Sequence, residues 1–127
     1  MGDQDRPPLF HTPTEMDINR VLLFSLHTDR IKVTIEAYFD EADNLVVEGY
    51  DIGAAVAEYW GDSDYEYSIT IAGQEVAHLY TLLELPVGDK QALLAYLKVH
   101  YHTNTCFSEL RNFLSRHHIP HQGFSWR

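Results

Sequence analysis

The chain has 127 residues, with nine Lys and Arg against nineteen Asp and Glu, and a formal net charge of −10. A chain of this length buries about two thirds of its unfolded surface, which is enough for one hydrophobic core without a disulfide or a structural metal. The acidic excess argues against binding to nucleic acid, because a phosphate backbone is bound through Lys and Arg.

Cysteine usage and hydropathy indicate the compartment. Cys106 is the single cysteine of the chain, so an internal disulfide is impossible and a reducing environment is expected. No stretch approaches the roughly 18–20 apolar residues of a membrane span, and the N-terminal residues lack the order of a signal peptide. We therefore expect a cytoplasmic protein that does not enter a membrane.

Four β-strands are predicted after a loosely ordered N-terminal arm over residues 1–18, where three prolines occur without periodicity. Residues 19–127 are expected to form a single α+β domain. The strands are predicted from apolar runs or from the alternation of apolar and polar residues, which places every second side chain on the same face. Their ranges are Val21–His27, Ile31–Asp40, Leu45–Asp51 and Asp64–Ile71.

Two glycines and a short helix separate the third strand from the fourth. We expect Gly49 and Gly53 to hold dihedrals or close contacts that a Cβ would disturb, and residues Ala54–Trp60 to form about two helical turns. In the fourth strand, one face is expected to carry Tyr65, Tyr67, Ile69 and Ile71, and the other face Asp64, Glu66, Ser68 and Thr70.

From Gly73 the apolar period becomes helical, and Pro86 ends the first helix of this part. Asp89 is the expected N-cap of a second helix, and a third begins near Thr105 and ends in basic residues. The final aromatic segment around Phe124 is expected to dock on the body. Strands followed by helices indicate an α+β fold: a four-stranded antiparallel meander sheet with about three C-terminal helices packed on one face.

Negative charge is concentrated in the middle of the chain, where thirteen acidic residues and no basic one lie between Lys32 and Lys90. Aromatic residues alternate there with carboxylates, a composition that suits an interface with aromatic anchors and charges that steer a cationic partner. The first interpretation is a non-enzymatic protein-binding module, similar to an immunity or inhibitor protein, that presents this surface to a basic protein partner. The predicted partner-binding residues are Tyr59, Trp60, Asp62, Asp64, Tyr65 and Glu66.

The alternative is a small metal-dependent enzyme or a ligand-binding protein built on Asp51, Asp62 and Asp64. An EF-hand is excluded, because Tyr67 and Gly73 stand where its glycine and its last glutamate belong. The histidines lack an ordered ligand pair, so neither a metal nor a cofactor is predicted. A pocket lined by carboxylates with perturbed pKa values favours the alternative, whereas a flat or convex acidic patch favours the first interpretation.

Two stretches and the C-terminus resemble a family of small uncharacterised bacterial proteins. They are Gly49-x-Asp51-x-Gly53, Trp60-Gly61-Asp62-x-Asp64-Tyr65-Glu66-Tyr67, and the close from His118-Ile119-Pro120 to Ser125-Trp126. This resemblance implies a shared fold after residue 20 and no particular activity. In size and charge the chain is also similar to immunity proteins of bacterial toxin systems, which are acidic domains that bind basic toxin domains, and that similarity implies a basic protein partner.

Overall fold

The computed structural model describes residues 19–60 and 64–126 of the chain. The arm predicted over residues 1–18 and the predicted site residue Asp62 lie outside the described residues. The elements in chain order are β1 (Arg20–His27), β2 (Lys32–Phe39), β3 (Leu45–Ile52), α2 (Ala54–Trp60), β4 (Asp64–Ile71), α3 (Gly73–Leu82), α4 (Lys90–His100), α5 (Cys106–Arg116) and β5 (Gln122–Trp126).

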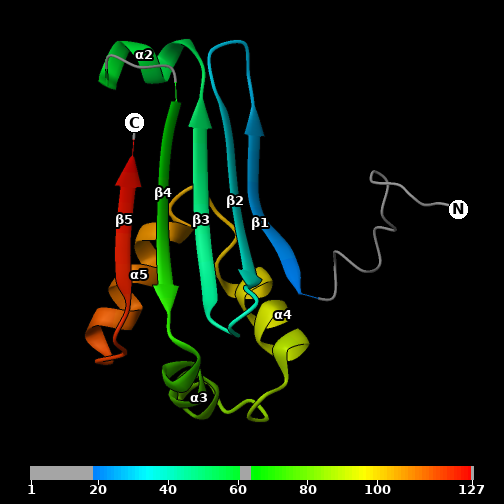
Figure 1. The fold of residues 1–127 in the computed structure, drawn as a ribbon. Coiled ribbons are helices and arrows are strands. Elements are labelled where there is room, and N and C mark those ends of the chain that lie inside the picture. The colour runs from blue at the N-terminus through cyan, green and yellow to red at the C-terminus, as the bar shows by residue number, and fades with distance from the viewer. Residues whose placement is uncertain (1–18, 61–63, 127) are drawn as a thin grey trace, which may run out of the picture.

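The strands form one antiparallel sheet in the order β1-β2-β3-β4-β5, so each strand pairs with the next strand of the sequence. Figure 1 shows α4 and α5 behind the sheet, α3 at its lower end and α2 at the opposite end. The predicted α+β class and the antiparallel sheet are therefore confirmed. None of the described helices is long and apolar enough to cross a membrane.

Two details of the predicted fold differ. A fifth strand, β5, pairs with β4 at the sheet edge, where we expected only a docked aromatic tail. Its five residues are too few for a clear alternation, and what makes them a strand is the pairing with β4, a tertiary contact. The described helices number four rather than about three, because the short helix α2, which the sequence predicts over Ala54–Trp60, adds to the three C-terminal helices.

The core lies between the sheet and the helices. Ile35 of β2 and Ile69 of β4 are at most 1% exposed, and Val33 packs partly buried against the same cluster. The alternation predicted for both strands is thereby confirmed. The helices contribute Val76, Leu79, Tyr80, Leu93, Leu94, Leu97, Cys106, Leu110 and Leu114 to this cluster.

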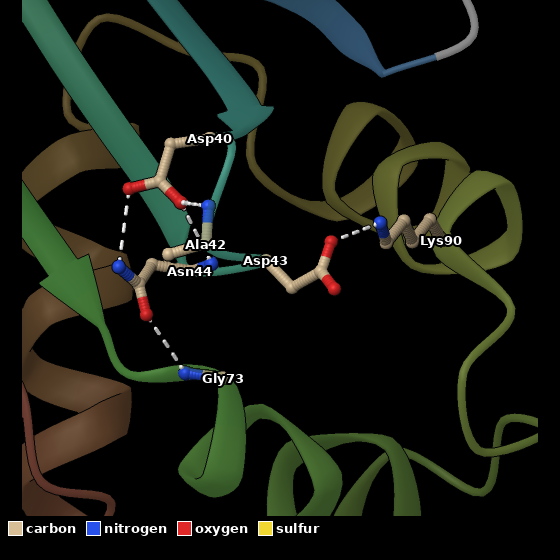
Figure 2. A network of polar contacts seen from close by, with 6 residues as sticks. All are labelled: Asp40, Ala42, Asp43, Asn44, Gly73 and Lys90. Carbon is tan, nitrogen blue, oxygen red and sulfur yellow. Dashed lines mark hydrogen bonds and ion pairs between the residues drawn. The ribbon is translucent and has the colours of Figure 1, made fainter.

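Helices α3 and α4 receive their N-terminal caps in different ways. The carboxylate of Asp89 accepts a hydrogen bond from the N–H of Ala92 at 3.0 Å, which confirms the predicted cap of α4. The residue before α3, Ala72, has no side chain that can cap. Instead, the amide oxygen of Asn44 in the β2–β3 hairpin accepts a hydrogen bond from the N–H of Gly73 at 3.0 Å (Figure 2). A donor that the helix itself leaves unpaired is thus satisfied by a distant turn.

The carboxylate of Asp40 holds this turn in shape (Figure 2). It accepts hydrogen bonds from the N–H of Ala42 at 2.9 Å, from the N–H of Asn44 at 3.0 Å and from the side-chain amide of Asn44 at 3.1 Å. From the same turn, Asp43 forms an ion pair with Lys90, the first residue of α4. One hairpin therefore positions the beginnings of both α3 and α4 against the sheet.

Two glycines confirm the predicted need for a missing Cβ. A Cβ on Gly49 of β3 would lie 2.0 Å from Cε2 of Tyr67, whose ring occupies that space. Gly53 has a φ of +132°, and a Cβ there would lie 2.5 Å from the carbonyl oxygen of Arg30. Close approach therefore requires glycine at the first position, and backbone conformation together with close approach requires it at the second.

We predict that Asp40→Asn destabilises the protein at neutral pH and that this difference shrinks in acid. The hydrogen bonds from Asn44 and Ala42 lower the pKa of Asp40 below its ordinary value of 3.8. A carboxyl group with a lowered folded-state pKa stabilises the fold above its unfolded pKa and loses that contribution as pH falls through the folded value. Urea unfolding of parent and variant from pH 7 downward measures the difference. A gap that stays constant below pH 3.8 contradicts the prediction, and Glu41→Gln in the same turn is the control.

We also predict that Gly49→Ala and Gly53→Ala each lower the free energy of unfolding by about 1–3 kcal/mol, through overpacking against Tyr67 and through backbone strain. Gly123→Ala is the matched control, because nothing lies within 4 Å of its added Cβ. Thermal or urea melts of the three variants test this. Equal stability of all three would show that the two glycines are incidental.

Candidate functional site

Strand β4 divides the predicted partner-binding residues between the two faces of the sheet. Tyr65 lies opposite Asp51 of β3 on the side of the helices, and its ring centroid is 5.2 Å from that of Tyr67. Asp64 and Glu66 point to the other side. Opposed residues of antiparallel strands share a face, and neighbours along a strand do not, so the carboxylates and the tyrosines of this segment belong to two different surfaces.

The remaining predicted site residues are described only in part. Tyr59 and Trp60 belong to α2, but their side chains lie outside the described residues, as does the whole of Asp62. The alternative set of Asp51, Asp62 and Asp64 is divided in the same way, since Asp51 faces the helices and Asp64 faces away from them. Among the described residues no group of three His, Cys, Asp or Glu side chains is arranged to hold a metal ion.

Two further carboxylates, which were not predicted as site residues from the sequence, lie near Glu66 because of the pairing register of the strands. On the face away from the helices, which we call the open face, Glu36 of β2 lies directly opposite Glu48 of β3. Glu48 lies opposite Ser68 of β4, which is two residues from Glu66. The three glutamates therefore follow one another across β2, β3 and β4. Only the pairing register reveals this row, because its members are far apart in the sequence.

Two of these glutamates have partners within the sheet. Arg20 of β1 forms an ion pair with Glu36, and its guanidinium lies 4.3 Å from the ring centroid of Tyr38. The hydroxyl of Tyr38 donates a hydrogen bond to Glu48 at 3.3 Å. These contacts compensate part of the repulsion between directly opposed like charges. Both compensating groups come from β1 and β2. The negative charge of the row is therefore least compensated at its β4 end.

Aromatic side chains border the open face along β5. Phe124 lies opposite Ser68 and is 62% exposed, and Trp126 lies opposite Glu66 and is 56% exposed. The three glutamates, with Tyr50 and Phe124, line a shallow hollow of about 450 Å³. Carboxylates and aromatic rings therefore do meet on one surface, although the rings come from β3 and β5 rather than from Tyr65.

The two edges of the sheet differ in how they are protected. Strand β1 has an irregular register between Leu22 and Phe24, and the ammonium group of Lys98 donates a hydrogen bond to the carbonyl oxygen of Leu22 at 2.6 Å. Bulges and lysines of this kind prevent an edge strand from pairing with another chain. Every residue of β5 is exposed. The edge next to the aromatic residues is therefore the more accessible one.

A second pocket, of about 420 Å³, lies on the helix side between the sheet and α5. It contains Asp51, which is half-buried and accepts a hydrogen bond at Oδ1 from the hydroxyl of Tyr67 at 2.8 Å. Phe107 of α5 meets the Tyr67 ring edge to face, with centroids 4.8 Å apart. Arg111, one helical turn further along α5, also lines this pocket.

Burial changes the titration of both hydrogen-bonded groups. Desolvation raises the pKa of Asp51 above its ordinary 3.8, and the hydrogen bond from Tyr67 compensates only in part. Desolvation, followed by the hydrogen bond to Asp51 and its charge, raises the pKa of Tyr67. Tyr67 therefore stays protonated and remains a hydrogen-bond donor at neutral pH. A carboxylate with a raised pKa in a pocket is the feature that we associated with ligand binding.

Comparison of the chain with protein-family models, with curated proteins and with solved structures gave no match. The resemblance to small bacterial proteins and the similarity to immunity proteins therefore stay predictions.

We predict that Asp51→Asn stabilises the protein at neutral pH. A carboxyl group with a raised folded-state pKa contributes its full stability below the unfolded pKa and loses it as pH rises through the folded value, so ionised Asp51 weakens the fold. Asparagine removes this charge and retains an oxygen that accepts from Tyr67.

Urea unfolding at pH 7 and below pH 3.8 measures this effect, and the advantage of the variant is expected to vanish in acid. The companion variant Tyr67→Phe removes the donor and is expected to raise the pKa of Asp51 further, as followed by NMR titration of the carboxyl carbon. An Asp51→Asn variant that is less stable than the parent at pH 7 contradicts the prediction.

Proposed function

We propose that the protein is a non-enzymatic binding module whose open face docks a basic protein partner. The observation that carries this proposal is the row of Glu36, Glu48 and Glu66 across three adjacent strands, on a face that no described helix covers. The exposed Phe124 and Trp126 beside this row supply apolar anchors. Asp64 and Glu66, two of the partner-binding residues predicted from the sequence, lie on this face.

Charge supports a cationic occupant. Arg20 and Tyr38 relieve part of the repulsion between the directly opposed Glu36 and Glu48, and a Lys or Arg side chain of the partner placed beside them relieves more of it. A surface potential of one sign also accelerates the approach of an oppositely charged protein. The acidic face repels a nucleic acid or an anionic membrane surface for the same reason.

Exposed aromatic side chains supply the apolar contacts of the proposed interface. Interface cores are enriched in large aromatic residues, which bind through desolvated packing, while rim charges set the rate of association. Phe124 and Trp126 lie on the same side of β5, two residues apart, with Glu66 opposite Trp126. An occupant that bears basic residues around an apolar centre matches this arrangement. An immunity or inhibitor protein that neutralises a basic domain is the type of protein that fits it.

We predict that the variant Glu36→Gln, Glu48→Gln, Glu66→Gln folds normally and loses its partner. The matched control is Glu41→Gln, Glu84→Gln, Glu109→Gln, which removes three exposed charges from the β2–β3 turn, the end of α3 and α5, and so changes the net charge equally. Parent, variant and control are used as baits in the native cell, and retained proteins are compared by quantitative mass spectrometry. A basic protein held by parent and control and lost by the variant is the expected result.

The kinetics with that protein separate the two kinds of contact. Association of the open-face variant is expected to be severalfold slower at low salt and equal to the parent at high salt, because exposed charges are screened over about 10 Å at 0.1 M. Phe124→Ala and Trp126→Ala are expected to accelerate dissociation at every salt concentration. Equal loss of partner by variant and control, or a retained partner that is acidic, contradicts the proposed function.

A further inference from the structure

Two side chains of opposite charge, Asp51 and Arg111, line the helix-side pocket without forming an ion pair. The carboxylate of Asp51 enters it from β3 and the guanidinium of Arg111 from α5. Among the ion pairs of the described residues there is none between Asp51 and Arg111. A half-buried carboxylate without a cation is costly, and folds that retain one in a pocket commonly use it to bind.

The carboxylate of Asp51 can accept a hydrogen bond from a ligand. The hydroxyl of Tyr67 donates to Oδ1 of Asp51, at 2.8 Å, and not to Oδ2. The ring of Tyr67 is itself fixed between the bare backbone of Gly49 and the edge-to-face contact with Phe107. The hydrogen bond from this fixed hydroxyl therefore orients the carboxylate of Asp51, whose Oδ2 keeps its capacity to accept hydrogen bonds.

Aromatic rings form the walls between the two charges. Tyr65 stands beside Tyr67, and the guanidinium of Arg111 lies 5.8 Å from the centroid of the Phe107 ring. The pocket volume of about 420 Å³ falls in the range of small-molecule sites, which combine apolar walls with a few polar groups.

We propose that this pocket binds a small zwitterion with an apolar body, such as a free aromatic amino acid or a dipeptide. The ammonium group of the ligand pairs with Asp51, its carboxylate pairs with Arg111, and its apolar part packs against Tyr65 and Phe107. A ligand with a single charge leaves one of the two protein charges without a partner, and so binds more weakly. The charged groups of this site, Asp51 and Arg111, lie on the other side of the sheet from the open face, although Tyr67 and Phe124 border both cavities.

The test is a titration of the full chain, followed by ¹H–¹⁵N NMR spectra, with L-phenylalanine and with glycyl-L-phenylalanine. These two probes differ in the distance between the ammonium and carboxylate groups. Phenethylamine lacks the carboxylate and 3-phenylpropionate lacks the amine. At least one zwitterion is expected to shift the amide signals of residues around the pocket, and to bind about tenfold more tightly than either singly charged compound, a difference of about 1.4 kcal/mol.

Two variants assign the charges. Asp51→Asn is expected to lower the affinity for the zwitterion about tenfold, so that the zwitterion binds no more tightly than 3-phenylpropionate. Arg111→Gln is expected to lower the affinity for the zwitterion to that for phenethylamine. Arg116→Gln, a loss of charge elsewhere on the same helix, is the control and leaves the affinity unchanged. The dispersion of the spectra verifies that each variant is folded.

Three results overturn the proposal. They are the absence of pocket shifts with both zwitterions, equal affinity for a zwitterion and its singly charged analogues, and an unchanged affinity in Asp51→Asn or Arg111→Gln. The variant with Gln at positions 36, 48 and 66 is expected to bind the zwitterion as the parent does. Failure at the open face and failure at this pocket are therefore distinguishable.

Discussion

The alternation of side chains across the sheet is the constraint on which the rest of this protein depends. Successive residues of a strand point to opposite faces, and the described helices cover only one face of this antiparallel sheet. Strand β4 therefore sends Tyr65 and Tyr67 toward the helices and sends Asp64 and Glu66 away from them. A segment that reads as one acidic and aromatic patch becomes two surfaces with different chemistry. The aromatic side forms a pocket and the acidic side forms an open face.

Both surfaces contain charges that weaken the fold. On the open face Glu36 and Glu48 oppose each other, with Arg20 and Tyr38 compensating part of their repulsion, and in the pocket burial disfavours the charge of Asp51. Asp40 shows the opposite behaviour, because its neighbours donate hydrogen bonds that lower its pKa and make its charge stabilising. Carboxylates that stabilise this protein thus occur at a turn that positions helices. Carboxylates that cost stability occur where we propose binding, in accordance with the usual conflict between stability and function.

Local patterns were enough to predict much of the fold. Period-two alternation identified β2 and β4 and their buried faces, and the propensity of aspartate for helix N-termini identified the cap of α4 at Asp89. Gly49 and Gly53 were identified by the conformational freedom of glycine alone. Each of these features depends on residues that are close together in the sequence.

The candidate sites were predicted less well, because they depend on contacts between distant residues. The row of glutamates needs the register of three strands, and the partnership of Asp51 with Phe107 and Arg111 needs the position of α5 against β3 and β4. Strand β5 was not predicted for the same reason. Its pairing with β4 makes this segment a strand, and its own sequence does not show that pairing. One signal was available in advance: the predicted alternation of Asp64–Ile71 already excluded a common face for Tyr65 and Glu66.

Tyr67 and Phe124 connect the two proposed sites, because each of them borders both the hollow on the open face and the pocket on the helix side. The ring of Tyr67 has little freedom to move, since Gly49, Asp51 and Phe107 hold it from three directions. Phe124 has more freedom, because it is largely exposed on an edge strand. If the proposed ligand ordered Phe124 from the pocket side, it would change the apolar anchor presented to the proposed partner on the open face. Coupling of this kind is reciprocal, so a partner that fixed Phe124 would change the affinity of the pocket by the same factor.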